Sequence, residues 1–342
     1  MRRKDSIYKE PNINRLLKTF HLEKTDRIPN LEFVIDSKVA SAILNKEVNG
    51  TLGMENPKDH LELAQRIGMD AIGFGIFYSP GRIWAKSNDG KSHYIDGSIK
   101  DWDDLKKITI PNIDSFKGSF NKLEKYLEVT KNTEVGVWIY IHGPFDPVYL
   151  AMGLTDFCLK LYDDFKFIEY LMDLILEVNC EILKEIVRFK PSFIQIADDV
   201  GMKNSLIIQP DLFKKMYIPR LKKLIEPAKK ENIPLTFHSD GCIKELIPEL
   251  IELGFCALNP IEPYSNDIYQ IKREFGDRIC LIGNIELTGR TVQQVKEDVK
   301  KHIDLLGERG YVVSSSHSVT DDTPVENFLA MVETTQNYGR KE

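Results

Sequence analysis

The stretch SFIQIADD, residues 192–199, decides the fold of this chain, because a short apolar run ends there in two adjacent carboxylates. Seven further apolar runs end near an acid, a histidine, an amide or a tyrosine. They are RIPNLEFVI (27–35), DAIGFGIF (70–77), EVGVWIYI (134–141), PLTF (234–237), FCALNPI (255–261), ICLIG (279–283) and YVVSSS (311–316). Each run precedes a stretch with helical periodicity. Eight such units in 342 residues predict an α/β fold, a parallel sheet closed into a (β/α)8 TIM barrel.

Two segments depart from this repeating unit. Residues 12–22 have a short helical pattern ahead of the first run, which predicts an N-terminal helical segment. Residues 79–101 contain two β-prone pieces around Asn88-Asp89-Gly90, which is a hairpin signal. We therefore expect a β-hairpin insertion after the second run, on the rim that carries the polar residues. Residues 1–342 are predicted to form one barrel domain.

Composition restricts the classes of partner. The formal net charge is -6, and charges of both signs are interspersed along the chain. A nucleic-acid groove needs a coherent basic face, so no nucleic-acid partner is expected. No apolar segment reaches the roughly 20 residues that span a bilayer, so the prediction is a cytoplasmic protein without a membrane partner. A homodimer is left open.

In a barrel, the residues that follow the strands share one rim, where barrel enzymes carry their active sites. His238 and Asp240 follow the run 234–237 two residues apart, so their side chains point the same way, and His317 follows the last run. Two imidazoles and one carboxylate around an open coordination position suit Zn²⁺ or another divalent ion. The alternative is that the two histidines bind a substrate through hydrogen bonds without a metal.

The ends of three other runs supply further polar residues. Asp198 and Asp199 are adjacent carboxylates, which can raise one another's pKa or hold a cation or hydroxyl groups, although one of the two must face outward. Glu262 and Asn284 follow the runs 255–261 and 279–283. Each of these two residues either orients a polar ligand or caps its loop.

The motif IHGPFDP, residues 141–147, places more polar groups near the predicted mouth. A bend at Gly143-Pro144 exposes Asp146 and Tyr149, while His142 fits a core position. Tyr78, at the end of the second run, is expected in the wall of the mouth. The remaining histidines are predicted to be solvated, namely His21, His60, His93 and His302.

Six blocks in a fixed order carry a resemblance over almost the whole chain. They are IHGPF (141–145), ADDVG (197–201) followed by QPDLFKKMYIPRLKKL (209–224), HSDG (238–241), NPIEP (259–263), IGNIE (282–286) and TPVEN (323–327). With these blocks the chain resembles the uroporphyrinogen decarboxylase superfamily, which also contains cobalamin-dependent methyltransferases. Each block alone is weak, whereas their order is specific.

Two branches of this superfamily differ in chemistry. Its decarboxylases carry an arginine-rich N-terminal substrate loop and an acid after the second strand, and neither is visible in NLEFVIDSKV (30–39) or GFGIFYSP (73–80). Its methyltransferases carry a His-x-Cys zinc pair and a second cysteine near the end of the barrel. The resemblance to this branch implies that His238 keeps its role as a zinc ligand, while Asp240 and His317 replace the two cysteines.

The replacement of thiolates changes the expected substrate. Thiolate ligands suit zinc that activates a thiol, whereas a His/Asp/His set is harder and suits an oxygen ligand. The resemblance therefore implies methyl transfer between a small O-methyl substrate and a corrinoid protein, with Zn²⁺ activation. The predicted catalytic residues are His238, His317, Asp199 and Tyr149, and the predicted substrate contacts are Asp198, Glu262, Asn284, Asp146 and Tyr78.

Two other interpretations remain open at this point. One is a metal-free decarboxylase or lyase that acts on a carboxylated ring, with His317 as the acid and Tyr149 as a polar contact. The other is a module without enzymatic activity that binds a corrinoid protein, which the dense polar rim disfavours.

Overall fold

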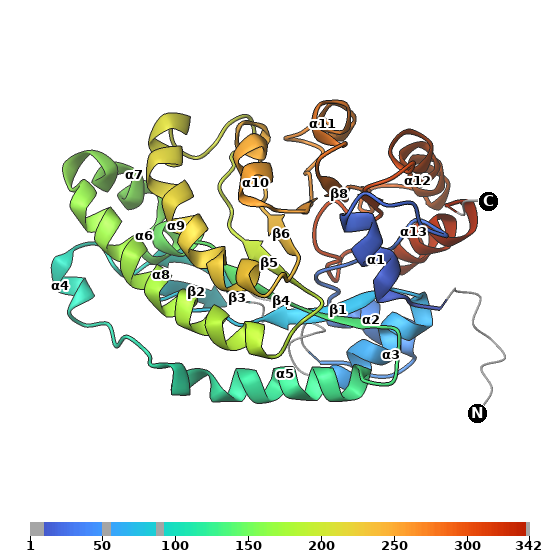
Figure 1. Ribbon diagram of the computed structural model, residues 1–342, viewed down its shortest axis with the longest axis horizontal. Helices are drawn as coiled ribbons and strands as arrows, with labels where there is room; N and C mark the ends of the chain where they lie inside the picture. The colour runs from blue at the N-terminus through green and yellow to red at the C-terminus, as the bar shows by residue number, and fades with distance from the viewer. Residues whose placement is uncertain (1–9, 50–55, 87–91, 340–342) are drawn as a thin grey trace.

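The computed structural model describes residues 10–49, 56–86 and 92–339, and a curled parallel sheet forms its centre (Figure 1). Seven strands are hydrogen-bonded in the order β1-β4-β5-β6-β7-β8-β9. Their bounds are β1 Ala71–Gly75, β4 Gly136–His142, β5 Phe193–Ala197, β6 Leu235–His238, β7 Ala257–Asn259, β8 Cys280–Ile282 and β9 Tyr311–Val312. These strands coincide with seven of the eight predicted runs, so the predicted barrel-type α/β fold is confirmed.

The first run, residues 27–35, occupies the eighth place in the ring without forming a regular strand. It makes isolated parallel bridges from Asn30 to Val313 and from Ile35 to Val319. On its other side the Asn30 carbonyl accepts a hydrogen bond from the Asp70 amide just before β1. Pro29 has no N–H to donate, which is one reason why the ladder is irregular here.

A buried carboxylate strengthens this closure. Glu32 accepts hydrogen bonds from the Ser315 amide at 2.8 Å and from the hydroxyls of Ser314 and Ser315. Burial raises the pKa of Glu32 to about 7, against the lowering effect of these donors. The segment therefore joins the first and last strands of the barrel through backbone and side-chain bonds.

Helices surround the sheet. Their bounds are α1 Ile13–Phe20, α2 Ser37–Leu44, α3 Pro57–Ile67, α4 Trp102–Leu105, α5 Lys117–Thr130, α6 Asp146–Met152, α7 Leu154–Asp163, α8 Phe165–Arg188, α9 Pro210–Lys230, α10 Ile247–Leu253, α11 Ile268–Phe275, α12 Val292–Leu306 and α13 Val325–Tyr338, with 3-10 turns η1 Ile113–Phe116 and η2 Lys244–Leu246. The predicted N-terminal helix is α1. No helix among residues 10–49, 56–86 and 92–339 is long and apolar enough to span a bilayer.

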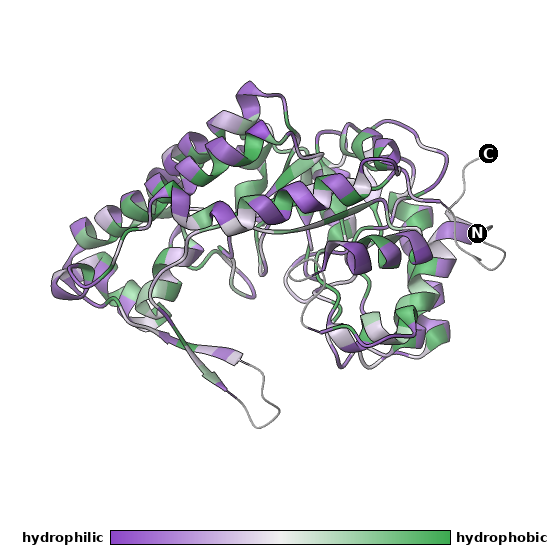
Figure 2. Cartoon of the chain, turned by 90° about the horizontal axis from the view of Figure 1, so that it is seen from below, coloured by the Kyte–Doolittle hydropathy of each residue, from purple (hydrophilic) through white to green (hydrophobic). Residues whose placement is uncertain are grey.

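The predicted insertion is an antiparallel hairpin of β2 Arg82–Lys86 and β3 Ser92–Gly97. Figure 2 shows it extending away from the layer of helices. Its predicted turn, Asn88-Asp89-Gly90, lies outside the described residues. Trp84 and Ile95 leave more than half of their side-chain surface exposed on this hairpin.

The N-terminal end of the barrel is filled by apolar side chains from the strands and from α1. Phe20 of α1 packs edge-on against Phe193, and Trp138 stacks on the same ring at 5.8 Å between centroids. This plug is part of a separate buried cluster of strand and helix residues. It leaves the opposite end, where the strands finish, for polar side chains.

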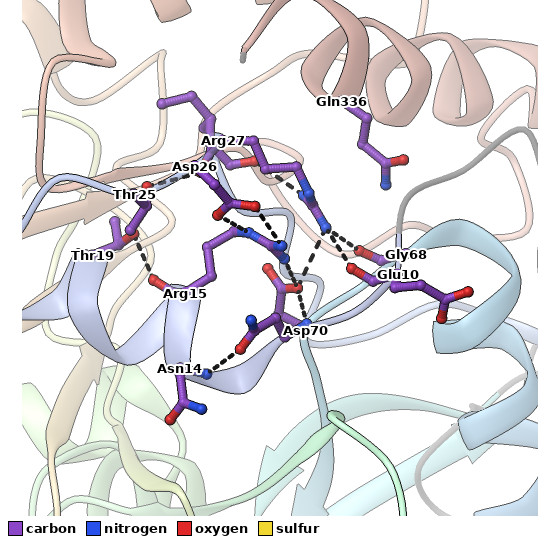
Figure 3. Close-up of polar contacts among 12 residues, drawn as sticks. Glu10, Asn14, Arg15, Thr19, Thr25, Asp26, Arg27, Gly68, Asp70 and Gln336 are labelled. Carbon is purple, nitrogen blue, oxygen red and sulfur yellow. Dashed lines mark hydrogen bonds and ion pairs between the residues drawn. The ribbon is translucent and has the colours of Figure 1, made fainter. Parts of the chain in front are cut away.

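Next to these apolar side chains lies a group of charged residues, most of them buried, which Figure 3 shows. Arg15 of α1 contacts Asp70 through Nη1 at 2.6 Å and Asp26 through Nε at 2.7 Å. Arg27 reaches Asp70 at 3.5 Å. Asp70 is fully buried, and burial raises its pKa to about 6 against the opposing charges of the two arginines. We call these four residues the lower charge cluster.

Candidate functional site

Three potential metal ligands meet where β5 and β6 end. Asp199, His238 and Asp240 each offer one donor atom, and these atoms lie within 4.8 Å of one another. The Nε2 atom of His238 is 3.8 Å from Asp199 Oδ1 and 4.0 Å from Asp240 Oδ1. We call these three residues the rim triad. One imidazole nitrogen and two carboxylate oxygens form a donor set that suits a divalent ion such as Zn²⁺.

The strand register fixes the orientation of His238. His238 lies opposite Asn259 in the β6–β7 pair, and its Nδ1 is 2.8 Å from Asn259 Oδ1. An amide oxygen only accepts hydrogen bonds, so Nδ1 carries a proton, and in the neutral imidazole Nε2 then presents its lone pair to the triad. Metal-binding histidines commonly donate the N–H of their other ring nitrogen to such an acceptor.

Asp240 has one oxygen that is ready for a cation. Its Oδ1 atom is buried and has no hydrogen-bond partner among the described residues. Its Oδ2 atom lies 3.3 Å from His317 Nε2, while its amide donates to Asp199 Oδ1 at 2.9 Å. Burial raises the pKa of Asp240, but the hydrogen bond from His317 and the charges of both histidines lower it below the usual value. A buried anionic oxygen without a partner fits a metal ligand.

His317 takes a different place from the predicted one. It lies outside the group of ligand atoms within 4.8 Å, and it contacts the outer oxygen of Asp240. The hydrogen bond with Asp240 raises the pKa of His317, whose side chain is 55% exposed. Of the predicted ligands His238, Asp240 and His317, the structure brings the first two together with Asp199 in place of His317.

The two adjacent carboxylates after β5 have separate tasks. Asp198 is fully buried, and it accepts hydrogen bonds from the amides of Phe145 at 3.1 Å and Asp146 at 2.5 Å. Successive residues of an extended strand point to opposite sides, so Asp199 faces the rim. The prediction that one of the pair faces away is confirmed. Asp198 is predicted to contact the substrate, and the structure places its carboxylate in the interior at the start of α6.

His142, Asp146 and Arg82 form a second polar group beside the triad. The Nδ1 atom of His142 is 2.8 Å from Asp146 Oδ1, and its Nε2 is 3.5 Å from Arg82 Nη2. Burial, followed by the charge of Arg82, lowers the pKa of His142 to about 3, so this imidazole is neutral. Burial and the charge of Asp199 raise the pKa of Asp146. The predicted polar residue Asp146 is thus near the triad but buried.

The remaining predicted contacts are dispersed around the rim. Glu262 accepts a hydrogen bond from the Gly241 amide at 2.8 Å, and its charge acts on the pKa of His317. Tyr78 has a buried hydroxyl without a partner among the described residues. Tyr149 packs against Phe145, and burial raises the pKa of its hydroxyl.

Asn284 is directed away from the triad. Its Oδ1 atom is 3.1 Å from His302 Nε2, and its Nδ2 donates to the Ile261 carbonyl. Asn284 and His302 line a separate cavity of about 730 Å³ between the loops after β7 and β8 and α12, which none of the triad residues line. The prediction that Asn284 orients a ligand beside the metal ligands is therefore not supported by its direction.

Two of the histidines expected on the surface are buried. His60 is 3.3 Å from the Tyr126 hydroxyl, and burial lowers its pKa to about 3. His302 is 4% exposed. Both lie on the inner face of an amphipathic helix, in phase with the apolar residues of α3 and α12. Helical spacing was the sequence signal that could have placed them.

Comparisons with known proteins agree with this architecture. The family model described as "Uroporphyrinogen decarboxylase (URO-D)" matches residues 82–338. A uroporphyrinogen decarboxylase of Vesicomyosocius okutanii subsp. Calyptogena okutanii (strain HA) is 25% identical over 132 residues, which cover 38% of this chain and 37% of that protein. One from Coxiella burnetii (strain Dugway 5J108-111) is 27% identical over 145 residues, 40% of this chain and 38% of the relative. The chain thus matches less than two fifths of the length of these curated relatives.

Solved structures provide longer matches at lower identity. A methyltransferase from Methanosarcina mazei has a TM-score of 0.74 and 18% identity, with 96% of this chain and 99% of that chain covered. A B12-independent methionine synthase from Shewanella sp. W3-18-1 has a TM-score of 0.51 and 13% identity, with 82% and 85% covered. At these identities the likeness concerns the fold.

Proposed function

Since this chain belongs to the uroporphyrinogen decarboxylase (URO-D) family, we propose that it is a methyltransferase of that family. The proposed reaction moves a methyl group between a small O-methyl substrate and a corrinoid protein, with Zn²⁺ bound at the barrel rim. The observation that carries the proposal is the rim triad of Asp199, His238 and Asp240. A metal-free decarboxylase has no evident use for an unpartnered buried carboxylate oxygen that faces an oriented imidazole.

The triad residues would hold the metal, which supplies Lewis acidity to the oxygen that carries the methyl group. Asn259 keeps the proton of His238 on Nδ1, so that Nε2 is free to coordinate. The Asp240 amide fixes Asp199 Oδ1. Two carboxylates and one neutral imidazole form a harder donor set than thiolates, which favours an oxygen over a sulfur substrate.

Other rim residues would act on the substrate without binding the metal. His317 holds a proton at Nε2 against Asp240 Oδ2, at the exposed edge of the site, where it can pass that proton to the oxygen that loses the methyl group. Tyr149 contributes an aromatic wall next to Phe145. Glu262 holds the Gly241 amide and thereby the loop that carries Asp240.

Metal analysis of the purified protein tests the metal centre. We expect about one Zn²⁺ per chain in the wild type and loss of that metal in His238→Ala. The matched control is His21→Ala, which removes an exposed histidine next to α1 and should leave the metal content unchanged. A metal-free wild type with full activity would refute the proposal.

Product analysis tests the reaction. A panel of methoxylated small molecules is incubated with the enzyme and Co(I) cobalamin, and methylcobalamin is followed by its absorbance. We expect methylcobalamin together with the demethylated product. The curated relatives are named as decarboxylases, so the alternative is a decarboxylation. Release of CO₂ from a carboxylated ring without any methylcobalamin would support that alternative.

A further inference from the structure

Arg82 is the one cation of the polar groups around the triad whose role the proposed reaction leaves open. It is the first residue of β2, at the point where the hairpin leaves the rim after β1. The base of the hairpin is held tightly against α6, because a Cβ atom on Gly97 would lie 2.2 Å from the Ala151 backbone. The backbone of Arg82, which pairs with Gly97, is therefore fixed in place.

The guanidinium of Arg82 has no carboxylate within ion-pair distance among the described residues. Among the described residues its one hydrogen bond goes to His142 Nε2 at 3.5 Å, and its Nε atom is buried with no partner there. The His142 imidazole is neutral, and it separates the guanidinium from Asp146. A partly desolvated cation whose donors lack partners costs free energy unless an anion pairs with it.

Arg82 and the triad face the same space. The charge of Arg82 lowers the pKa values of His142 and Asp146, and the charge of Asp199 raises them. The pKa of Tyr149 is likewise raised by the charge of Asp199 and lowered by the charge of Arg82. Arg82 contacts His142 at the end of β4, and His142 pairs with Ala197, two residues before Asp199, so the arginine and the triad lie at the ends of neighbouring strands.

Aromatic rings line the side of this space next to Arg82. Phe77 stacks on Tyr140 at 5.5 Å between ring centroids and meets the His142 ring edge-on at 4.1 Å. Phe77 and Tyr140 are both only partly buried. Partly buried rings beside a cation suit an aromatic ligand with an anionic group.

We propose that Arg82 binds a carboxylate of the substrate, so that the substrate class is a methoxylated aromatic acid. The planar guanidinium matches a carboxylate through two parallel hydrogen bonds. The carboxylate end lies at Arg82 and the methoxy end lies at the triad, and in this respect the inference rests on the proposed function. Neutral methyl ethers of the same shape then bind weakly.

Calorimetric titration of the zinc-loaded protein tests this assignment with two probes of nearly the same shape, 3-methoxybenzoate and neutral 3-methoxybenzamide. We expect the wild type to bind the acid at least 10-fold more tightly than the amide. In Arg82→Gln the affinity for the acid falls by about 10- to 100-fold, while the affinity for the amide changes little. Arg82→Lys recovers part of the loss, because it keeps the charge without the planar fork.

The matched control is Lys86→Gln, which removes an exposed cation from the same strand. It should leave the affinity for 3-methoxybenzoate unchanged. Equal losses in Lys86→Gln and Arg82→Gln, equal affinity of the wild type for acid and amide, or no binding of the acid would each overturn the assignment.

Turnover with the same probes separates this inference from the proposed function. If the acid binds through Arg82 but no methylcobalamin forms, the methyl-transfer proposal fails and the carboxylate site stands. If both probes are demethylated equally by the wild type and by Arg82→Gln, the methyl-transfer proposal stands and the carboxylate site fails. Zinc content, measured in parallel, should be identical in all variants.

Discussion

The two ends of the barrel both hold groups of charged side chains, but they balance the charge differently. In the lower charge cluster, Arg15 and Arg27 face the buried Asp70 and the mostly exposed Asp26, so the two signs are equal in number. At the rim, Asp199 and Asp240 face His238, an imidazole whose Nε2 lone pair points toward them. Within the rim triad itself, negative charge thus exceeds positive charge.

This difference separates stability from function. A balanced buried cluster is complete without a ligand, and removal of one partner leaves an uncompensated charge. A cluster with excess negative charge is complete only when a cation binds, so natural selection for stability alone would not favour it. Substitutions at the two ends should therefore have opposite effects on folding and on metal binding.

The largest effect on stability is expected at the lower end. Asp70→Asn leaves Arg15 and Arg27 buried without their shared anion, and this should lower the free energy of unfolding by about 3–5 kcal/mol. Denaturant unfolding measures the change, and the zinc content of the folded fraction should be normal. The control is Asp26→Asn, whose carboxylate is mostly exposed and whose loss should cost less than about 1 kcal/mol. Equal costs for the two variants would contradict the contrast between buried and exposed partners.

The next effect concerns the adjacent residues Asp198 and Asp199 after β5, at the rim. Asp199→Asn should weaken zinc affinity by about 100-fold or more, and it should not destabilise the metal-free protein, because it removes negative charge. Asp198→Asn should instead destabilise the protein and leave its zinc affinity unchanged, since the carboxylate of Asp198 holds the amides of Phe145 and Asp146. Competition with a chelator measures affinity and thermal unfolding measures stability. Loss of zinc in Asp198→Asn at normal stability would break the distinction.

A smaller effect is expected from the residue behind His238. Asn259→Ala removes the acceptor that keeps the proton on Nδ1, so zinc affinity should fall by about 10-fold. Asn259→Asp restores an acceptor and should recover zinc affinity. If neither variant changed zinc affinity, His238 would not depend on this contact for its orientation.

The smallest effect is a pH dependence of the metal-free protein. The hydrogen bond with Asp240 raises the pKa of His317 in the folded state above its unfolded value of 6.5. The stability from this pair is therefore fully present below pH 6.5, and it is lost as the pH rises through the folded pKa. His317→Gln should be less stable than the wild type by under about 1 kcal/mol at pH 6, because His317 is half exposed, and the gap should close at pH 9. Thermal unfolding across this range measures the gap, and a gap that widened with pH would contradict the assignment.

The fold could be predicted from sequence to a large extent because strand ends alternate with helical stretches along the whole chain. Seven of the eight runs became strands. The first run could be located but its irregular pairing could not be predicted, because its bridges depend on residues near position 315. The spacing of His238 and Asp240 placed both at the rim for the same reason that strand residues alternate.

The site was less predictable where loops decide the direction of a side chain. Which of Asp198 and Asp199 faces the rim depends on the phase of β5, and the reach of His317 depends on an irregular segment after β9. No sequence pattern indicated a functional role for Arg82, since a cation at the start of a hairpin is usually solvated. Its position follows from packing of the hairpin base against α6, which no local pattern encodes.

The irregular segment at residues 27–35 also has a consequence for the order of assembly during synthesis. It pairs with Val313 and Val319, and Glu32 binds Ser315, so its partners emerge from the ribosome nearly 300 residues later. Until then the ring stays open, and the segment has a free edge on the side where Val313 and Val319 later pair, which other chains can reach. For this reason a shortened chain that ends before β9 should self-associate instead of folding. Early termination of translation would produce such chains.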